Sequence, residues 1–213
     1  SGRTSTPDPN PSIELDTYYV YDDFGNLAIV LSPKASELIV DGSSLASNHQ
    51  ALLDELGYQY SYDHRNRLVR KKLPGKDVEY IAYDPLDRPI ATGPVLSPFG
   101  DGSEGWLRTK YDPFGRVAYT SWVTGTITEP NRQAIEDTQG TDYSETRTSN
   151  YTTINGVEFG YTNNVAPTTG FHILTINYYD DYSWPNAPSN IPGTVGDGDS
   201  SVYYNNAQLP KGL

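Results

Sequence analysis

One ten-residue stretch, Lys110–Tyr119, constrains the fold more than any other part of the chain. At its centre, residues 112–115 read Asp-Pro-Phe-Gly. An aspartate at the start of a turn can accept hydrogen bonds from backbone amides ahead of it, and a proline presets φ at the next position. Gly115 can supply the positive φ that closes a type I turn into a hairpin loop with a bulge. The stretch therefore predicts a β-hairpin, which we expect to extend over Trp106–Trp122.

Three further stretches repeat the same frame of a tyrosine, an aspartate, two variable residues and a residue that closes the turn. They begin at Tyr21, Tyr62 and Tyr83. The closing residue is glycine, asparagine or aspartate, and these types best tolerate a left-handed φ. The sequence thus predicts four hairpin turns. Their structural residues are Asp22, Gly25, Asp63, Asn66, Asp84, Asp87, Asp112, Pro113 and Gly115.

A single hairpin cannot bury both of its faces, so consecutive hairpins are expected to stack edge to edge. The predicted fold is mainly β, with stacked antiparallel hairpins forming a twisted sheet or a segment of a β-shell. Eighteen tyrosines and a hydrophobic content of 36% suit sheets whose rings pack while their hydroxyls reach water.

One or two short helices are expected to interrupt the strands. A helical insertion is predicted at about residues 44–57, with Ser47 as its N-cap and Gly57 as its C-cap. A second helix is predicted at about residues 129–137, because a proline suits the first turn of a helix. The β domain is expected to cover residues 13–184. A Pro-rich linker (1–12) precedes it, and a loop-rich segment (185–213) leads into the rest of a longer protein.

The four repeats resemble the YD-repeat family, also called RHS repeats, whose pattern is Tyr-Asp-x-x-Gly-Arg followed by an apolar residue. The pattern is complete at Tyr111–Val117 and nearly complete at Tyr21–Leu27, where Asn26 replaces the arginine. The chain is most similar to the type found in large surface or secreted proteins of Bacteroidota. The resemblance implies hairpins that spiral into a β-shell, which encloses a polypeptide cargo in toxin-related members. It also implies an extracellular or cell-surface location.

Charge and composition exclude several functions. The net charge of −12 argues against nucleic acid, because phosphate binding needs positive charge. No apolar run is long enough to span a bilayer, so no membrane insertion is expected. The absence of cysteine excludes disulfides and thiolate metal sites. The three histidines lack metal-ligand spacing, so we expect no metal, cofactor or catalytic residue. A calcium site at the Asp-rich residues 197–199 stays open.

Three functions are compatible with this sequence. The first is a non-enzymatic scaffold, in which the chain is part of a shell or adhesin and its partners are the remainder of a longer repeat protein and an enclosed polypeptide. The second is a carbohydrate-binding adhesion module that stacks sugars on Trp106, Trp122 and Trp184. The third and most remote is a hydrolase in residues 131–170, where the repeat pattern lapses.

Overall fold

The computed structural model describes residues 16–40, 45–180 and 183–187. Over these residues the protein is mainly β, as predicted, with eleven strands and three helices. Nine strands are hydrogen-bonded to one another in an open antiparallel order, and the other two form a separate hairpin. The chain divides into two compact units, Ser1–Tyr80 and Ile81–Leu213, which are described in turn.

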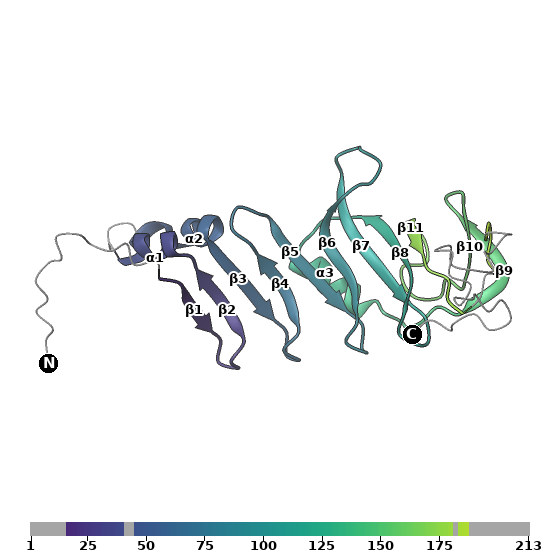
Figure 1. The fold of residues 1–213 in the computed structure, drawn as a ribbon, viewed down its shortest axis with the longest axis horizontal. Coiled ribbons are helices and arrows are strands. Elements are labelled where there is room, and N and C mark those ends of the chain that lie inside the picture. The colour runs from purple at the N-terminus through teal and green to yellow at the C-terminus, as the bar shows by residue number, and fades with distance from the viewer. Residues whose placement is uncertain (1–15, 41–44, 181–182, 188–213) are drawn as a thin grey trace, which may run out of the picture. The chain divides into compact units, whose positions relative to one another are not determined.

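The first unit is a run of antiparallel strands with a helical insertion in its chain order (Figure 1). Each strand pairs with the strand that follows it. Although two helices separate β2 from β3 in the chain, Val30 still pairs with Tyr58, so the insertion leaves the ladder continuous. The elements are β1 (Tyr18–Tyr21), β2 (Leu27–Leu31), α1 (Pro33–Val40), α2 (Leu45–Leu56), β3 (Gly57–Tyr62), β4 (Leu68–Lys72) and the first half of β5 (Val78–Tyr83).

The helical insertion differs from the prediction in three ways. It contains two helices, and α1 was not predicted. Helix α2 begins at Leu45, so Ser47 lies within it and is not its N-cap. Gly57 lacks a positive φ and is the first residue of β3. A Cβ at Gly57 would lie 3.0 Å from the Leu53 carbonyl oxygen, so this glycine permits a close approach between helix and strand.

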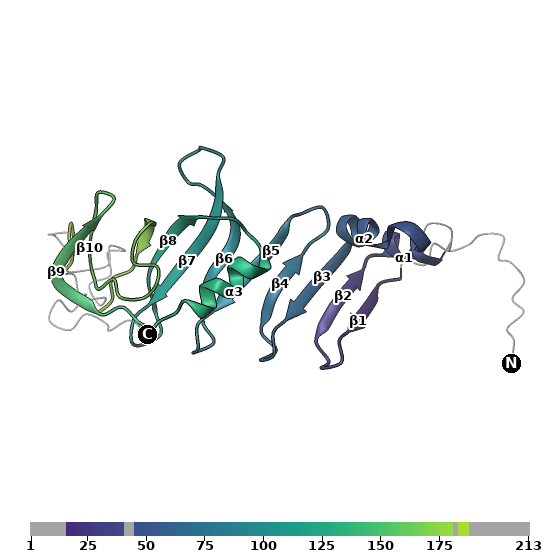
Figure 2. The ribbon, with the colours of Figure 1, turned by 180° about the vertical axis from the view of Figure 1, so that it is seen from behind.

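The second unit combines the last two repeat hairpins with a region outside the repeats. Its main sheet follows the order β5-β6-β7-β8-β11. Figure 2 shows α3 against one face of these strands. The remaining elements are β6 (Pro89–Leu96), β7 (Glu104–Tyr111), β8 (Val117–Thr124), α3 (Glu129–Asp137), β9 (Arg147–Ile154), β10 (Val157–Tyr161) and β11 (His172–Ile176).

Helix α3 matches the predicted second helix. Thr128 is its N-cap, with extended backbone, and the Thr128 side chain accepts a hydrogen bond from the Asn131 amide. Pro130 lies in the first turn, where its missing N–H leaves no bond unmade.

The hairpin of β9 and β10 was not predicted, although its turn has a strong local pattern. Asn155 and Gly156 both have positive φ, 50° and 81°, and Ile154 pairs with Val157 across them. An Asn-Gly pair between β-prone runs is the preferred turn of a two-residue hairpin. The pattern was present in the sequence, and the hairpin could have been predicted from it.

The core of the second unit lies where β8, β10 and β11 meet. Tyr119 and Phe159 are fully buried, and their rings pack edge to face with centroids 5.5 Å apart. Each buried aromatic side chain contributes about 1.5–3 kcal/mol to folding. The buried cluster consists of Ala118, Tyr119, Phe159, Tyr161 and Phe171.

Each repeat turn places a positive φ at its closing residue: 81° at Gly25, 59° at Asn66, 63° at Asp87 and 78° at Gly115. In each turn the closing residue's amide donates to the carbonyl of the aspartate three residues earlier, at 3.0 Å. The four turns therefore share one backbone conformation, although their closing residues differ.

We predict that Gly115→Val lowers the free energy of unfolding by about 1–3 kcal/mol, because valine strongly disfavours positive φ. A Cβ at Gly115 would contact nothing within 4 Å, so crowding does not contribute. Chemical denaturation measures the change. Gly140→Val is the matched control: Gly140 is exposed, has no positive φ and also has open space around it. Equal stability of the two variants would contradict the turn assignment.

Candidate functional site

Three of the four repeat turns share a side-chain arrangement as well as a backbone conformation. At Asp112, Oδ1 accepts the amides of Phe114 and Arg116, each at 2.9 Å, while Oδ2 accepts Arg116 Nε at 2.6 Å. The same bonds recur from Arg67 to Asp63 and from Arg88 to Asp84. We call this arrangement the Asp–Arg clamp.

In the first repeat turn, Asn26 takes the place of the arginine. Its Nδ2 donates to Asp22 Oδ2 at 3.1 Å and also to Asn66 Oδ1 in the next turn of the same unit. Neighbouring turns therefore touch through their side chains. The turn role of the aspartates was predicted from the sequence, but that of the residue four positions later was not, although an Asp-to-Arg spacing of four recurs in three repeats.

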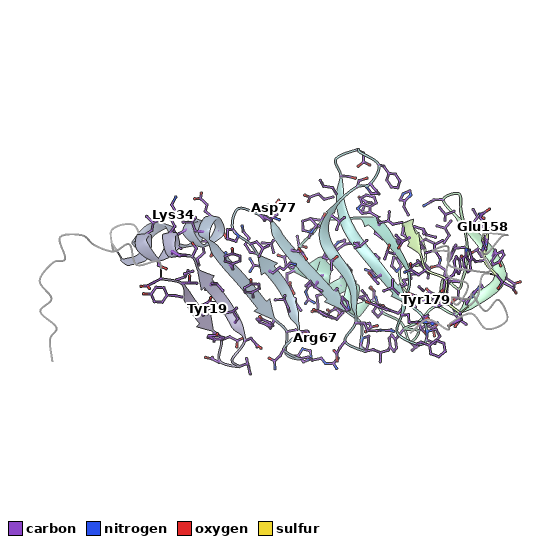
Figure 3. The ribbon with its side chains drawn as sticks, in the orientation of Figure 1. Tyr19, Lys34, Arg67, Asp77, Glu158 and Tyr179 are labelled. Carbon is purple, nitrogen blue, oxygen red and sulfur yellow. The ribbon has the colours of Figure 1, made fainter. Side chains whose placement is uncertain are left out.

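Arginines of the clamp also reach beyond their own turns. Figure 3 labels one arginine of the clamp, Arg67, at the turn between β3 and β4. It also labels Tyr179, whose ring contacts another arginine of the clamp, Arg116. Arg116 lies 4.2 Å from the centroid of the Tyr179 ring and pairs with Asp180 at 3.0 Å. The hydrogen bond to Asp180, together with that to Asp112, raises the pKa of Arg116. The guanidinium thus ties the last repeat turn to the chain that follows β11.

A buried charged cluster lies beside the core of the second unit. Glu145 is fully buried, and its carboxylate pairs with Lys110 Nζ at 3.1 Å. It also accepts the hydroxyl of Tyr119 and the amides of Asn164 and Val165. The Thr162 hydroxyl donates to it at 2.7 Å. One carboxylate thereby joins β7, β8 and the loop that follows β10.

Burial shifts the proton affinity of this cluster. Removal of the ammonium from water outweighs its attraction to Glu145 and lowers the pKa of Lys110 to about 8. Burial and the nearby carboxylate raise the pKa of Tyr119. A lysine with a lowered pKa can act as a nucleophile. Lys110 is only 2% exposed, however, so a substrate cannot reach it, and the cluster serves to hold the fold.

A pocket of about 380 Å³ lies between α3 and the sheet of the second unit. Arg108 is the only ionisable side chain among the residues that line it. It is 6% exposed, and its Nη2 donates to the Ala166 carbonyl oxygen at 3.0 Å. Burial lowers the pKa of Arg108 to about 10. Sequence reasoning missed this residue, because nothing local distinguishes it from an exposed strand arginine.

Two of the three tryptophans predicted to stack on sugars are buried, so that prediction is wrong for them. Trp106 and Trp122 are each 4% exposed. Trp122 packs against Phe99, and its indole Nε1 donates to the Val95 carbonyl oxygen. Trp184 is only partly buried and stacks on Tyr178, with ring centroids 5.4 Å apart and planes within 7°.

Two of the predicted segments lie outside the described residues. The Pro-rich linker (1–12) and the Asp-rich residues 197–199 lie outside them. Within the described ranges, no group of three or more histidine or acidic side chains is placed to hold a metal ion. No described helix is both long and apolar enough to cross a membrane.

No family model matches the chain, and no curated protein matches it.

We predict that Lys110→Met lowers the free energy of unfolding by about 3 kcal/mol, because it leaves the Glu145 carboxylate buried without its counter-charge. Adding Glu145→Gln should recover at least half of this loss, since the double variant buries no charge. Chemical denaturation of the single and double variants measures both. Lys71→Met is the matched control, because its pair with Glu79 is partly exposed and should contribute less than about 1 kcal/mol. A double variant no more stable than Lys110→Met would contradict the pairing.

We predict that the lowered pKa of Lys110 makes the free energy of unfolding rise with pH between about pH 8 and pH 10.5. In this window the unfolded chain holds a proton on Lys110 that the folded chain has released, so this contribution to stability rises with pH. Relative to the Lys110→Met/Glu145→Gln double variant, the wild type should therefore gain about 3 kcal/mol across the window. A ¹⁵N NMR titration of Lys110 Nζ gives the midpoint directly. A midpoint near the ordinary value of 10.5 would contradict the prediction.

Proposed function

We propose that the chain is a non-enzymatic structural segment of a large secreted or cell-surface protein of the YD-repeat type. The observation that carries this proposal is the clamped turn, repeated four times with the same backbone bonds and in three cases with the same arginine contact. A repeated local unit that adds strands to a sheet suits a role as a wall or spacer. The family assignment itself rests on the repeat pattern.

The chemical groups of the described chain support a structural role more than catalysis. The repeat aspartates accept hydrogen bonds within their own turns, from backbone amides and from an arginine or, at Asp22, an asparagine side chain. In residues 131–170, the proposed location of a hydrolase, Glu145 is fully buried among donors. A general acid or base must contact a substrate, and this carboxylate is closed to one.

The partners we propose follow from sheet edges. In the described part of the chain, β1 is an edge strand, and the side chains of Tyr19 and Tyr21 are 58% and 59% exposed. An open edge can pair with a further strand. We propose that the remainder of a longer repeat protein continues the sheet, and that the resulting shell encloses a polypeptide.

Carbohydrate binding is the second candidate, and it now rests on Trp184. Its indole ends a stack of three rings, in which Tyr161 and Tyr178 lie 5.5 Å apart and Tyr178 lies 5.4 Å from Trp184. Aromatic faces held rigidly in this way are suited to stack on sugar rings. The burial of Trp106 and Trp122 removes the other two platforms, so the scaffold is the better-supported function.

Antibody labelling of the producing cells tests the proposed location. An antibody raised against the purified chain should label intact cells or detect the protein in the medium, and external protease should remove the cell-bound signal. A cytoplasmic protein serves as the control for lysis. Signal found only after cells are opened would overturn the surface assignment.

A glycan array tests the second candidate. The scaffold predicts no saturable binding by the folded chain. Trp122→Phe is the control, because the Trp122 indole is buried. Saturable binding that is lost in Trp184→Ala and kept in Trp122→Phe would favour the adhesion module over the scaffold.

A further inference from the structure

The pocket of the second unit has one wall from a helix and a floor from two strands. Asn131, Ala134 and Ile135 lie on one face of α3 and line the pocket, together with the C-cap residue Thr138. Strands β7 and β8 contribute the floor, and Ala166 and Pro167 close one side. A volume of about 380 Å³ falls within the range of small-molecule sites.

Alternation along β7 places Trp106, Arg108 and Lys110 on the face that the pocket occupies. The register sets Arg108 opposite Ser121 on β8 and beside Ala91 on β6. Ala91 is small and buried, so it contributes neither charge nor bulk next to the guanidinium. The Ser121 hydroxyl is buried and has no hydrogen-bond partner among the described residues.

Arg108 is a buried arginine with no carboxylate beside its guanidinium in the described ranges. Its one hydrogen bond within the described chain goes to a neutral carbonyl oxygen, that of Ala166. The nearest charged neighbour on its strand face, Lys110, is also a cation and is paired with Glu145. None of the acidic residues in the described ranges lies within ion-pair distance of Arg108. A buried guanidinium without a carboxylate is costly, and an anion in the pocket would remove that cost.

We propose that this pocket binds a small molecule that carries a carboxylate on a flat, apolar body. The carboxylate accepts hydrogen bonds from the Arg108 guanidinium, whose fork geometry matches two carboxylate oxygens. The apolar body packs against Trp106, Val123 and Ile135, which line the same space. This activity goes beyond the scaffold role and does not depend on it.

Because the chain has a negative net charge, binding of a carboxylate depends on its short-range contact with Arg108. At −12 the protein repels anions at long range, so a carboxylate gains nothing from steering. Preference for a carboxylate over its neutral analogue therefore reports short-range contacts in the pocket, and the Arg108→Met variant tests whether Arg108 makes them.

Phenylacetate and 2-phenylacetamide are the probes, since they share a ring and differ in charge. We expect saturable binding of phenylacetate by the full chain in ¹⁵N NMR titrations, with shifts in the amides of β7 and α3. The amide should bind at least about tenfold more weakly, because it forfeits a charge-assisted hydrogen-bond pair. Failure of phenylacetate to bind, or equal binding of the two probes, would overturn the proposal.

Two variants separate a ligand site from a purely structural arginine. Arg108→Met should abolish the preference for phenylacetate, whereas Arg65→Met, which changes an exposed arginine in a turn, should retain it. Ala134→Phe fills the pocket from an exposed position on α3 and leaves Arg108 intact. It should weaken phenylacetate binding at least tenfold with an unchanged melting temperature. Full affinity in Ala134→Phe, or a retained preference in folded Arg108→Met, would place the binding elsewhere and refute the site.

Discussion

The fold depends on one interaction, the acceptance of backbone amides by an aspartate at the start of each repeat turn. In a tight hairpin loop, the amides two and four residues after the aspartate point inward without strand partners. The carboxylate of Asp112 satisfies both, and the second oxygen then holds the guanidinium of Arg116. Because the bond is local, it fixes the turn without help from the rest of the sheet. This explains why the closing residue can vary among glycine, asparagine and aspartate while the aspartate and its contacts persist.

The region outside the repeats covers one face of the sheet of the second unit. A strand hairpin leaves one sheet face open, and in the second unit that face carries buried charge on Lys110. Glu145 and the residues near 162–165 supply the counter-charge and the remaining hydrogen bonds. Closing the face in this way holds the polar groups in a fixed arrangement, because Lys110 Nζ donates to both Glu145 and Asn163 while the carboxylate accepts several donors at once. After β8, where the repeat pattern lapses, β11 still adds a strand to the sheet, while Glu145 and residues 162–165 cover its face.

Sequence reasoning succeeded where the determining contacts are local and failed where they are not. Turn aspartates, positive-φ positions and the capped helix α3 depend on residues within four or five positions of one another. The same holds for the Asn155-Gly156 turn, which was missed although its pattern was present. The burial of Trp106 depends instead on Gly93 and Gly125, which lie close to its ring from β6 and from the chain after β8. That of Trp122 depends on packing against Phe99 and on a hydrogen bond to the Val95 carbonyl oxygen. Likewise, Arg108 and Ser121 are brought together by the strand register, which cannot be predicted from their spacing in the sequence.

A scaffold alone does not account for Arg108. In three repeat turns, by contrast, the guanidinium of the arginine pairs with the carboxylate of its own turn. A buried strand position that needed only to fill space would be better occupied by an apolar side chain, which carries no desolvation cost. At Arg108 the chain instead keeps a cation whose pKa burial lowers to about 10, bonded to one carbonyl and bordering open space. The cost is consistent with a site that an anion completes, since a charge left unmatched in the protein alone is matched in the complex.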